Sequence, residues 1–213
     1  MIDLTSWEAR FAAFIERSEM QADVAHDREH VRRVVANARR LADAEGADLA
    51  IVIPAAWLHD CVVLPKNSPQ RPLASAMAAT AASSFLALAG YPPFHIPAIA
   101  HAILAHSFSA AIAPLTLEAR IVQDADRLDA LGAVGLARCL MLGGQLGLPL
   151  YDPAEPFPHQ RSPDDDRFTL DHLYTKLLGL AATMNTPTGR AEAERRTAFL
   201  DQFLQQLASE LGV

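Results

Sequence analysis

Apolar and polar residues recur along most of the chain with the period of an amphipathic α-helix. The clearest pattern lies between residues 28 and 45, where one stripe repeats at i, i+4, i+7 and i+11. The stripe consists of His30, Val34, Asn37 and Leu41. Asp27 is suited to cap the start of this helix, and Gly46 is suited to end it. We therefore expect a helix whose core-facing side includes a histidine.

The same period, bounded by prolines, glycines and capping residues, predicts about eight helices. They cover about residues 5–20, 28–45, 48–61, 73–89, 95–106, 115–142 (with or without a break near 126), 169–184 and 187–211. Pro54 lies inside the third helix, so we expect a kink or a later helix start there. Residues 145–167 are rich in Pro and Asp and lack a period, which predicts a long ordered loop or a lid. With no internal repeat and no linker, the sequence predicts a single all-α domain over residues 1–213.

Composition narrows the class of protein. About half of the 213 residues are apolar and a fifth are charged, as in an ordinary soluble globular protein. The formal net charge of −7 argues against nucleic acid or an anionic membrane as a partner. We expect no membrane span and find no signal-peptide pattern at the N-terminus. Two cysteines, Cys61 and Cys139, are too few for a disulfide framework, so we interpret them as reduced thiols of a cytoplasmic protein.

Chemistry is first suggested by the apolar run that ends in His59-Asp60. Burying an imidazole beside a carboxylate is costly unless something pairs with them, and a metal ion would pair with both. Metal-compatible residues also gather in three other segments, residues 26–30, 101–106 and 124–129. Each segment alone has a simpler explanation, because a lone histidine on an apolar stripe is usually a hydrogen-bonded core residue.

The combination is more specific than its parts. Two imidazoles and two carboxylates leave two positions of an octahedral ion open for water and substrate. Such a set suits Mn²⁺, Fe²⁺, Co²⁺, Ni²⁺ or Zn²⁺ better than a thiolate-bound structural zinc. A bound metal also makes hydroxide available near neutral pH. We favour one Mn²⁺ ion, with Mg²⁺ as a further candidate.

The set His30, His59-Asp60 and Asp126 resembles the H…HD…D ligand motif of the HD-domain metal-dependent phosphohydrolases. The match runs from about residue 26 to 135, and residues 172–178 and 184–190 also resemble one bacterial subgroup of HD hydrolases and nucleotide pyrophosphohydrolases. The resemblance implies an all-α fold and these four metal ligands. It also implies hydrolysis of a phosphoester or phosphoanhydride bond in a small phosphorylated metabolite, with a nucleotide favoured.

Two departures from that family concern catalysis and metal count. Several branches carry a Glu shortly after the HD pair, whereas Cys61 to Leu64 contain no carboxylate, so the proton-transfer group stays open. The candidates for catalytic roles are Asp60, His106, Asp27 and Asp129. Other branches hold a second metal with histidines placed like His101 and His106, but their i, i+5 spacing does not share one helix face well. We therefore favour a single ion.

Phosphate binding requires cations and hydrogen-bond donors. The loop after the HD pair supplies Lys66, Ser68 and Arg71, and the C-terminal part supplies Lys176, one of two lysines in the chain. His106 is a further candidate for contact with a phosphate. Each has a plainer interpretation: a solvated loop, a lysine whose head group reaches water, or a histidine that complements a helix dipole.

The leading hypothesis is therefore a metal-dependent phosphohydrolase for a nucleotide or a similar small metabolite. One alternative is a non-catalytic nucleotide or metal sensor that keeps the HD fold. Another is a di-iron HD oxygenase. The sequence leaves the oligomeric state, the native metal and the leaving group open.

Overall fold

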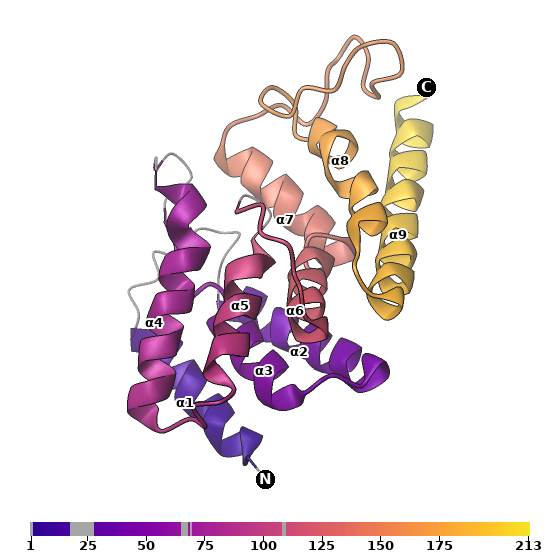
Figure 1. Cartoon of the computed structure of the whole chain (residues 1–213). Helices are drawn as coiled ribbons and strands as arrows, with labels where there is room; N and C mark the ends of the chain where they lie inside the picture. Colours follow the sequence, from indigo (N-terminus) through magenta and orange to yellow (C-terminus); the bar gives the residue numbers. More distant parts are fainter. Residues whose placement is uncertain (1, 18–27, 65–67, 69, 108–109) are drawn as a thin grey trace. The chain divides into compact units, whose positions relative to one another are not determined.

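The computed structural model describes residues 2–17, 28–64, 68, 70–107 and 110–213. In this part of the chain the regular secondary structure is helical throughout, which confirms the all-α class (Figure 1). The α-helices are α1 (Leu4–Arg17), α2 (Arg28–Glu45), α3 (Leu49–Leu58), α4 (Ala74–Ala89), α5 (Ile96–His106), α6 (Leu117–Leu128), α7 (Gly132–Gln145), α8 (Asp171–Thr175) and α9 (Pro187–Leu211). Two 3-10 helices, η1 (Arg71–Leu73) and η2 (Leu177–Thr183), precede α4 and follow α8.

By its internal contacts the chain divides into two compact units. The first unit is residues 1–126, with α1 to α5 and most of α6. The second unit is residues 127–213, with α7, α8, η2 and α9. The expectation of one domain over the whole chain stays a prediction.

Helix α3 is the centre of the first unit and packs against α1, α2 and α5. Six of its residues are buried: Val52, Ile53, Pro54, Ala55, Ala56 and Leu58. Asp48 caps the start of the helix, since its side chain accepts a hydrogen bond from the Ala50 amide at 2.8 Å. The predicted stripe on α2 is buried at all four positions, so α2 turns its histidine toward α3.

Pro54 does not delay the start of α3, which begins at Leu49. A proline has no N–H, so the carbonyl of Ala50, four residues earlier, loses its partner within the helix. The hydroxyl of Tyr91 donates to that carbonyl at 2.5 Å. Burial, with a smaller contribution from the charge of Asp48, raises the pKa of Tyr91 to about 12. The hydroxyl therefore keeps the proton that it donates to the broken turn.

Helix α4 turns small residues inward, and α5 packs against it. Its buried positions are Ser75, Ala78, Ala79, Ala82 and Leu86. By length and composition alone, Arg71–Ala89 could cross a membrane, with a mean hydropathy of 1.4. The expectation of no membrane span stays a prediction. A core helix of a globular protein passes the same test.

Two predicted elements of the second unit differ from the structure. The expected helix 169–184 is broken into α8 and η2 at Lys176, whose backbone has φ −139° and ψ −58°. On α9 the apolar pattern also allows an inner side made of Phe199, Phe203, Leu204 and Leu207. In the structure Leu200 and Leu204 are buried and Phe199 is 41% exposed. The apolar pattern of α9 fits both phases, and only packing selects between them.

The long loop between α7 and α8 is ordered by buried charge. Asp171 is fully buried and accepts two hydrogen bonds from the Arg161 guanidinium, one of them at 2.8 Å. The Asp164 amide donates to the same carboxylate at 2.6 Å. Burial alone raises the pKa of Asp171, but the Arg161 contacts outweigh it and lower the pKa overall. The expected ordered loop over residues 145–167 therefore has a specific anchor.

The contact between Tyr91 and the Ala50 carbonyl predicts coupling with Pro54. The substitution Tyr91→Phe should lower the free energy of unfolding by about 1–2 kcal/mol, because the carbonyl loses its donor. In a Pro54→Ala background the restored backbone N–H can take over, so the same substitution should cost less than about half as much. Urea unfolding of all four variants measures the difference. An equal loss in both backgrounds would contradict the interpretation.

Candidate metal centre

His59 follows the last residue of α3 and is fully buried. Its Nδ1 lies 2.8 Å from the Ala56 carbonyl oxygen. A carbonyl only accepts hydrogen bonds, so Nδ1 carries the proton. The Nε2 lone pair therefore points away from the helix end, in the form that a metal ion requires.

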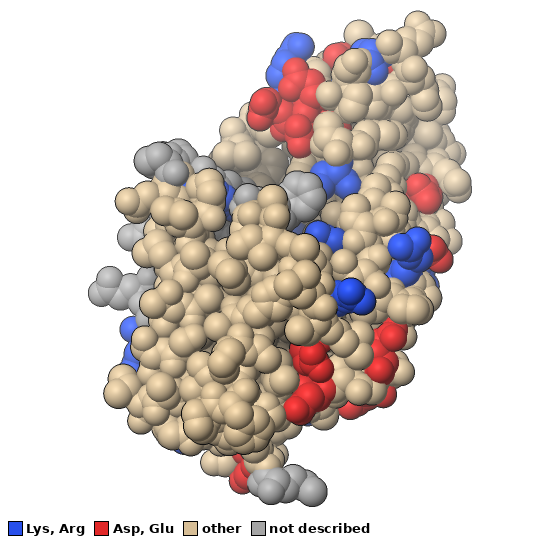
Figure 2. All heavy atoms as spheres, in the orientation of Figure 1, with Lys and Arg blue, Asp and Glu red and all other residues tan. Residues whose placement is uncertain are grey.

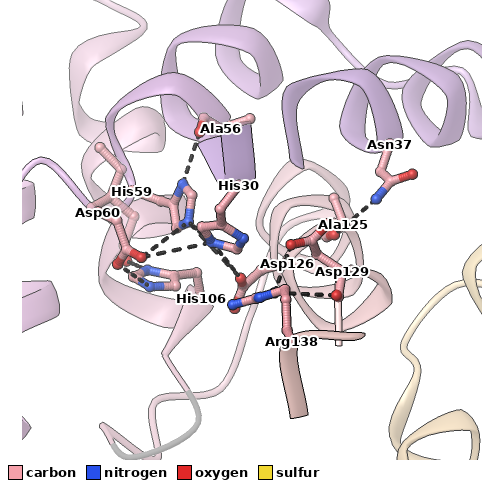
Figure 3. A network of polar contacts seen from close by, with 11 residues as sticks. His30, Asn37, Ala56, His59, Asp60, His106, Ala125, Asp126, Asp129 and Arg138 are labelled. Atoms are coloured by element: carbon pink, nitrogen blue, oxygen red, sulfur yellow. Dashed lines mark hydrogen bonds and ion pairs between the residues drawn. The ribbon is translucent and has the colours of Figure 1, made fainter. Parts of the chain in front are cut away.

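Four side chains of the first unit converge on one point (Figure 3). His30 Nε2 lies 3.4 Å from Asp126 Oδ1 and 3.8 Å from Asp60 Oδ2. His59 Nε2 lies 3.5 Å from Asp60 Oδ2 and 3.9 Å from Asp126 Oδ1. The two Nε2 atoms are 3.4 Å apart. Helices α2 and α6 and the end of α3 thus bring together residues that are far apart in the sequence.

The donor set fits a divalent ion. His30, His59 and Asp60 form a group whose ligand atoms all lie within 4.8 Å of one another. Imidazole nitrogen and carboxylate oxygen bind such ions at about 2.0–2.2 Å, which places neighbouring ligands roughly 3.0–3.4 Å apart. The observed separations of 3.4–3.9 Å are equal to this spacing or longer, so a bound ion would draw the side chains together by up to about 0.9 Å. Two carboxylates also balance the charge of a divalent cation.

The ionisation states suit the same purpose. Burial lowers the pKa of His59 despite the opposing charge of Asp60, which favours the neutral ring. Burial raises the pKa of Asp126, but the hydrogen bond and charge of His30, with His59 and His106, outweigh it and lower the pKa overall. A neutral imidazole and an ionised carboxylate are the ligand forms that bind metal.

His106, the last residue of α5, is a third buried histidine beside this group. Its Nδ1 donates to the Ile103 carbonyl at 2.5 Å, and its Nε2 lies 3.5 Å from Asp60 Oδ1. The carboxylate of Asp60 therefore faces the His30 and His59 rings with one oxygen and His106 with the other. Burial lowers the pKa of His106, but the hydrogen bond and charge of Asp60 outweigh it and raise the pKa.

His101, also on α5, makes a different contact. Its Nε2 accepts a hydrogen bond from the Leu115 backbone amide at 3.0 Å. That nitrogen is therefore unavailable as a ligand while the contact holds. The structure brings His106, and not this nitrogen of His101, to Asp60, as the i, i+5 spacing suggested.

Two buried amides that the sequence analysis did not assign to the site fix α6 near Asp126. Gln123 Nε2 donates to the Ala105 carbonyl on α5 at 2.6 Å. Asn37 Nδ2 donates to the Ala125 carbonyl at 3.4 Å and so links α2 to α6. The signal in the sequence was their polarity at core positions: Asn37 on the apolar stripe of α2, and Gln123 one turn before Asp126.

The remaining candidates make other contacts, are exposed or lie outside the described residues, and their catalytic or binding roles stay predictions. Asp129 is buried in the second unit, where Arg138 Nη1 donates to its Oδ2 at 2.6 Å and to its backbone carbonyl at 3.1 Å (Figure 3). No motif or spacing in the sequence singles out this arginine. Lys176, also in the second unit, is exposed at the break after α8. Asp27 and Lys66 lie outside the described residues.

Ser68 and Arg71 shape the loop that precedes α4. Ser68 Oγ accepts a hydrogen bond from the Gln70 amide at 3.2 Å, and the Ser68 carbonyl accepts one from the Arg71 amide at 3.1 Å. The Arg71 guanidinium donates to the Leu64 carbonyl at 3.5 Å. The proposed contact of both side chains with phosphate stays a prediction.

Comparisons with known proteins agree with this geometry. The family model described as HD domain matches residues 28–131. The chain is 35% identical over 190 residues to the uncharacterised protein YpgQ of Bacillus subtilis (strain 168), across 87% of this chain and 84% of YpgQ.

Solved structures resemble the whole chain. The crystal structure of Bacillus subtilis YpgQ in complex with ADP has a TM-score of 0.72 at 31% identity, covering 97% of this chain and 95% of that one. An HD-superfamily hydrolase from Bacillus thuringiensis has a TM-score of 0.76 at 31% identity and covers 98% of both chains. The crystal structure of a Lactobacillus plantarum protein has a TM-score of 0.73 at 36% identity, covering 100% of this chain and 99% of that one. With its fold, its convergent ligand set and these relatives, the chain belongs to the HD-domain family.

Proposed function

We propose that the protein is a metal-dependent phosphohydrolase that holds one divalent ion through His30, His59, Asp60 and Asp126. The observation that carries the proposal is the approach of one atom from each of these side chains to within 3.4–3.9 Å of its neighbours. Because two imidazoles and two carboxylates fill only part of an octahedral shell, water and a substrate oxygen can complete it. Mn²⁺ is the favoured ion.

A nucleotide is the favoured substrate. The relative YpgQ was crystallised in complex with ADP, and it matches this chain over nearly its whole length. ADP carries a phosphoanhydride and a phosphoester, the two bond types implied by the H…HD…D motif. Nucleotide binding to this chain is thus a proposal by similarity, and it leaves open whether phosphate or pyrophosphate is released.

When bound, a divalent ion lowers the pKa of water and neutralises negative charge on a phosphoryl oxygen. Asp60 and Asp126 supply the charge that retains such an ion in a buried setting. His106 Nε2 lies 3.5 Å from Asp60 Oδ1, at the edge of the ligand group. Because Nδ1 already donates to the Ile103 carbonyl, Nε2 can donate a hydrogen bond to a substrate oxygen when the ring is protonated on both nitrogens. Lys66, Ser68 and Arg71, in the loop directly after the HD pair, are the proposed phosphate contacts, with Lys176 as a further candidate.

The alternative functions lack a comparable observation. A nucleotide sensor without activity would not need the complete ligand set. A metal sensor would need it, and turnover is what distinguishes an enzyme from such a sensor. A di-iron oxygenase would need a second set of ligands. His101 is a candidate for that set, but its Nε2 accepts a hydrogen bond from the Leu115 amide.

Removing one carboxylate should abolish tight metal binding. Asp126→Asn keeps the shape of the side chain but removes its charge, so the affinity for Mn²⁺ should fall by more than about 100-fold. Calorimetric titration of metal-free protein measures the affinity, and elemental analysis should give one ion per wild-type chain. The matched control is Asp43→Asn, at an exposed position of α2, which should bind like wild type. Unchanged affinity in Asp126→Asn would contradict the ligand assignment.

Activity should depend on the ion and on Asp60. Protein freed of metal by a chelator and reloaded with Mn²⁺, Co²⁺, Ni²⁺ or Mg²⁺ is assayed with nucleoside di- and triphosphates, and the products are separated by ion-exchange chromatography. Asp60→Ala should lower the rate by about 1,000-fold or more, since a bound metal contributes several kcal/mol of charge stabilisation. Asp43→Ala should retain wild-type activity. If wild-type protein hydrolyses none of these substrates faster than Asp60→Ala does, the phosphohydrolase proposal is excluded.

A further inference from the structure

Ser75, in the first turn of α4, is buried and only 3% exposed. Its hydroxyl oxygen is covered and has no hydrogen-bond partner among the described residues. The large majority of buried polar side-chain atoms are hydrogen-bonded, because an unpaired one costs free energy. The Ser75 hydroxyl is therefore either a cost to the fold or a group that a ligand completes.

Other hydroxyl groups of α4 show what a helix ordinarily offers such a side chain. Thr80 Oγ1 donates to the Ala76 carbonyl at 2.9 Å. Ser83 Oγ donates to the Ala79 carbonyl at 2.7 Å. Each bonds to the carbonyl four residues earlier, which satisfies the donor within the helix. Ser75 does not make this bond, so its hydroxyl can donate to a partner outside the helix backbone.

The position of Ser75 relates it to the candidate metal centre. Cys61, directly after the proposed ligand Asp60, donates from Sγ to the Ala78 carbonyl at 3.5 Å. Ala78 lies on the same buried side of α4 as Ser75, three residues further on, which is about 4.5 Å along the helix. Ser75 is therefore less than one turn from the point where α4 meets the chain next to Asp60.

The end of α5 lies beside the same part of α4. The two helices pack together and are joined by residues 90–95, so they run antiparallel (Figure 1). His106, the last residue of α5, is therefore near the first half of α4. Its Nε2 lies 3.5 Å from Asp60 Oδ1. Ser75, His106 and Asp60 thus belong to one region of the first unit.

The start of this helix favours an anion as the partner of the hydroxyl. Arg71–Ala89 form one continuous helical stretch, whose N-terminal end carries the positive end of the helix dipole. The Arg71 amide there already donates to the Ser68 carbonyl at 3.1 Å, whereas the Ser75 hydroxyl is an unused donor within the described residues. Residues 72–117 contain no Asp or Glu that would repel an anion. In Figure 2 the face over α4 and α5 is accordingly a broad area without red atoms.

We propose that the Ser75 hydroxyl donates a hydrogen bond to a phosphoryl oxygen of the substrate held at the metal centre. This inference rests on the proposed function, which supplies the metal ion and the phosphorylated substrate. A phosphoryl oxygen accepts hydrogen bonds and carries the negative charge that a helix N-terminus favours. Binding then supplies the partner that the fold does not, so Ser75 lowers the stability of the free protein and contributes to affinity.

The approach to Ser75 involves Arg71. Residues 61–64 run along the first turns of α4, from the contact with Ala78 to the Arg71 guanidinium, which donates to the Leu64 carbonyl at 3.5 Å. That distance is at the outer limit of a hydrogen bond. In the proposed complex a phosphate takes Arg71 as its partner, which releases Leu64 and opens the way to the hydroxyl.

Calorimetric titration of the Mn²⁺-loaded full chain with inorganic phosphate tests the contact. A hydrogen bond to a charged acceptor is worth about 10-fold to 100-fold in affinity, so Ser75→Ala should weaken phosphate binding by that factor. Ser75→Cys, measured with a reducing agent, keeps the size of the side chain but has a weaker donor and should lose nearly as much. The matched control is Ser83→Ala, which removes a hydroxyl already bonded within α4 and should bind phosphate like wild type. The affinity for Mn²⁺ should be unchanged in all three variants.

Urea unfolding of the metal-free protein gives a second readout, which separates a binding role from a structural one. Ser75→Ala removes a hydroxyl that the fold leaves unpaired and introduces a better helix former, so its urea midpoint should rise above that of wild type. When Mn²⁺ and phosphate are added at the same concentrations to both proteins, this difference should shrink, because the ligand stabilises wild type more.

Three results would overturn the proposal. The first is a Mn²⁺-loaded wild type that binds no phosphate. The second is a Ser75→Ala or Ser75→Cys variant that binds phosphate as tightly as wild type. The third is a lower urea midpoint of metal-free Ser75→Ala, which would make the hydroxyl a structural group.

Phosphate binding is measured without turnover, so this inference and the proposed function can fail separately. If Ser75→Ala loses phosphate affinity but wild type hydrolyses no nucleotide, only the proposed function is contradicted. If wild type is an active phosphohydrolase and Ser75→Ala keeps its phosphate affinity, only the role of Ser75 is contradicted.

Discussion

The organising constraint of the first unit is electrostatic: two carboxylates are held against two buried imidazoles. His30 is 2% exposed and His59 is fully buried, and both face Asp60 and Asp126 within 4 Å. Without a cation, the negative charges would have to be protonated or offset by a charged histidine. A divalent ion would supply the matching positive charge. The arrangement is therefore better explained as a binding site than as part of the core, where these buried polar groups would lower stability.

Much of the surrounding structure holds this point in place. Helix α3 can be apolar on nearly every side because α1, α2 and α5 cover it. The backbone contacts of Gln123 and Asn37 fix α6, so that Asp126 faces the histidines rather than solvent. The first turn of α3, interrupted by Pro54, is closed by Tyr91 from beyond α4. Polar side chains thus locate the helices, and apolar packing supplies their stability.

Local sequence signals predicted what local interactions determine. The bounds of α2 and the cap at Asp48 could be predicted because each depends on residues within a few positions of one another. The ligand set is spread from His30 to Asp126, and it could be proposed only through the resemblance to a known motif. The break at Lys176, the phase of α9 and the pairing of Asp129 with Arg138 could not be predicted. Each of these depends on which of several compatible packings the rest of the chain permits. Asp129 illustrates the difference: its type and position suggested chemistry, while its partner makes it part of a buried ion pair.

The order of the ligands along the chain has a consequence for synthesis. His30, His59 and Asp60 are made first, and Asp126 follows 66 residues after Asp60. At about 5–20 residues per second, the nascent chain holds an incomplete ligand set for about 3–13 seconds. During that time it can hold an ion only weakly and cannot yet select among ions by the full geometry. At the proposed metal site, selection among ions therefore depends on the finished fold. The ion that the nascent chain meets first does not determine which ion the folded protein holds.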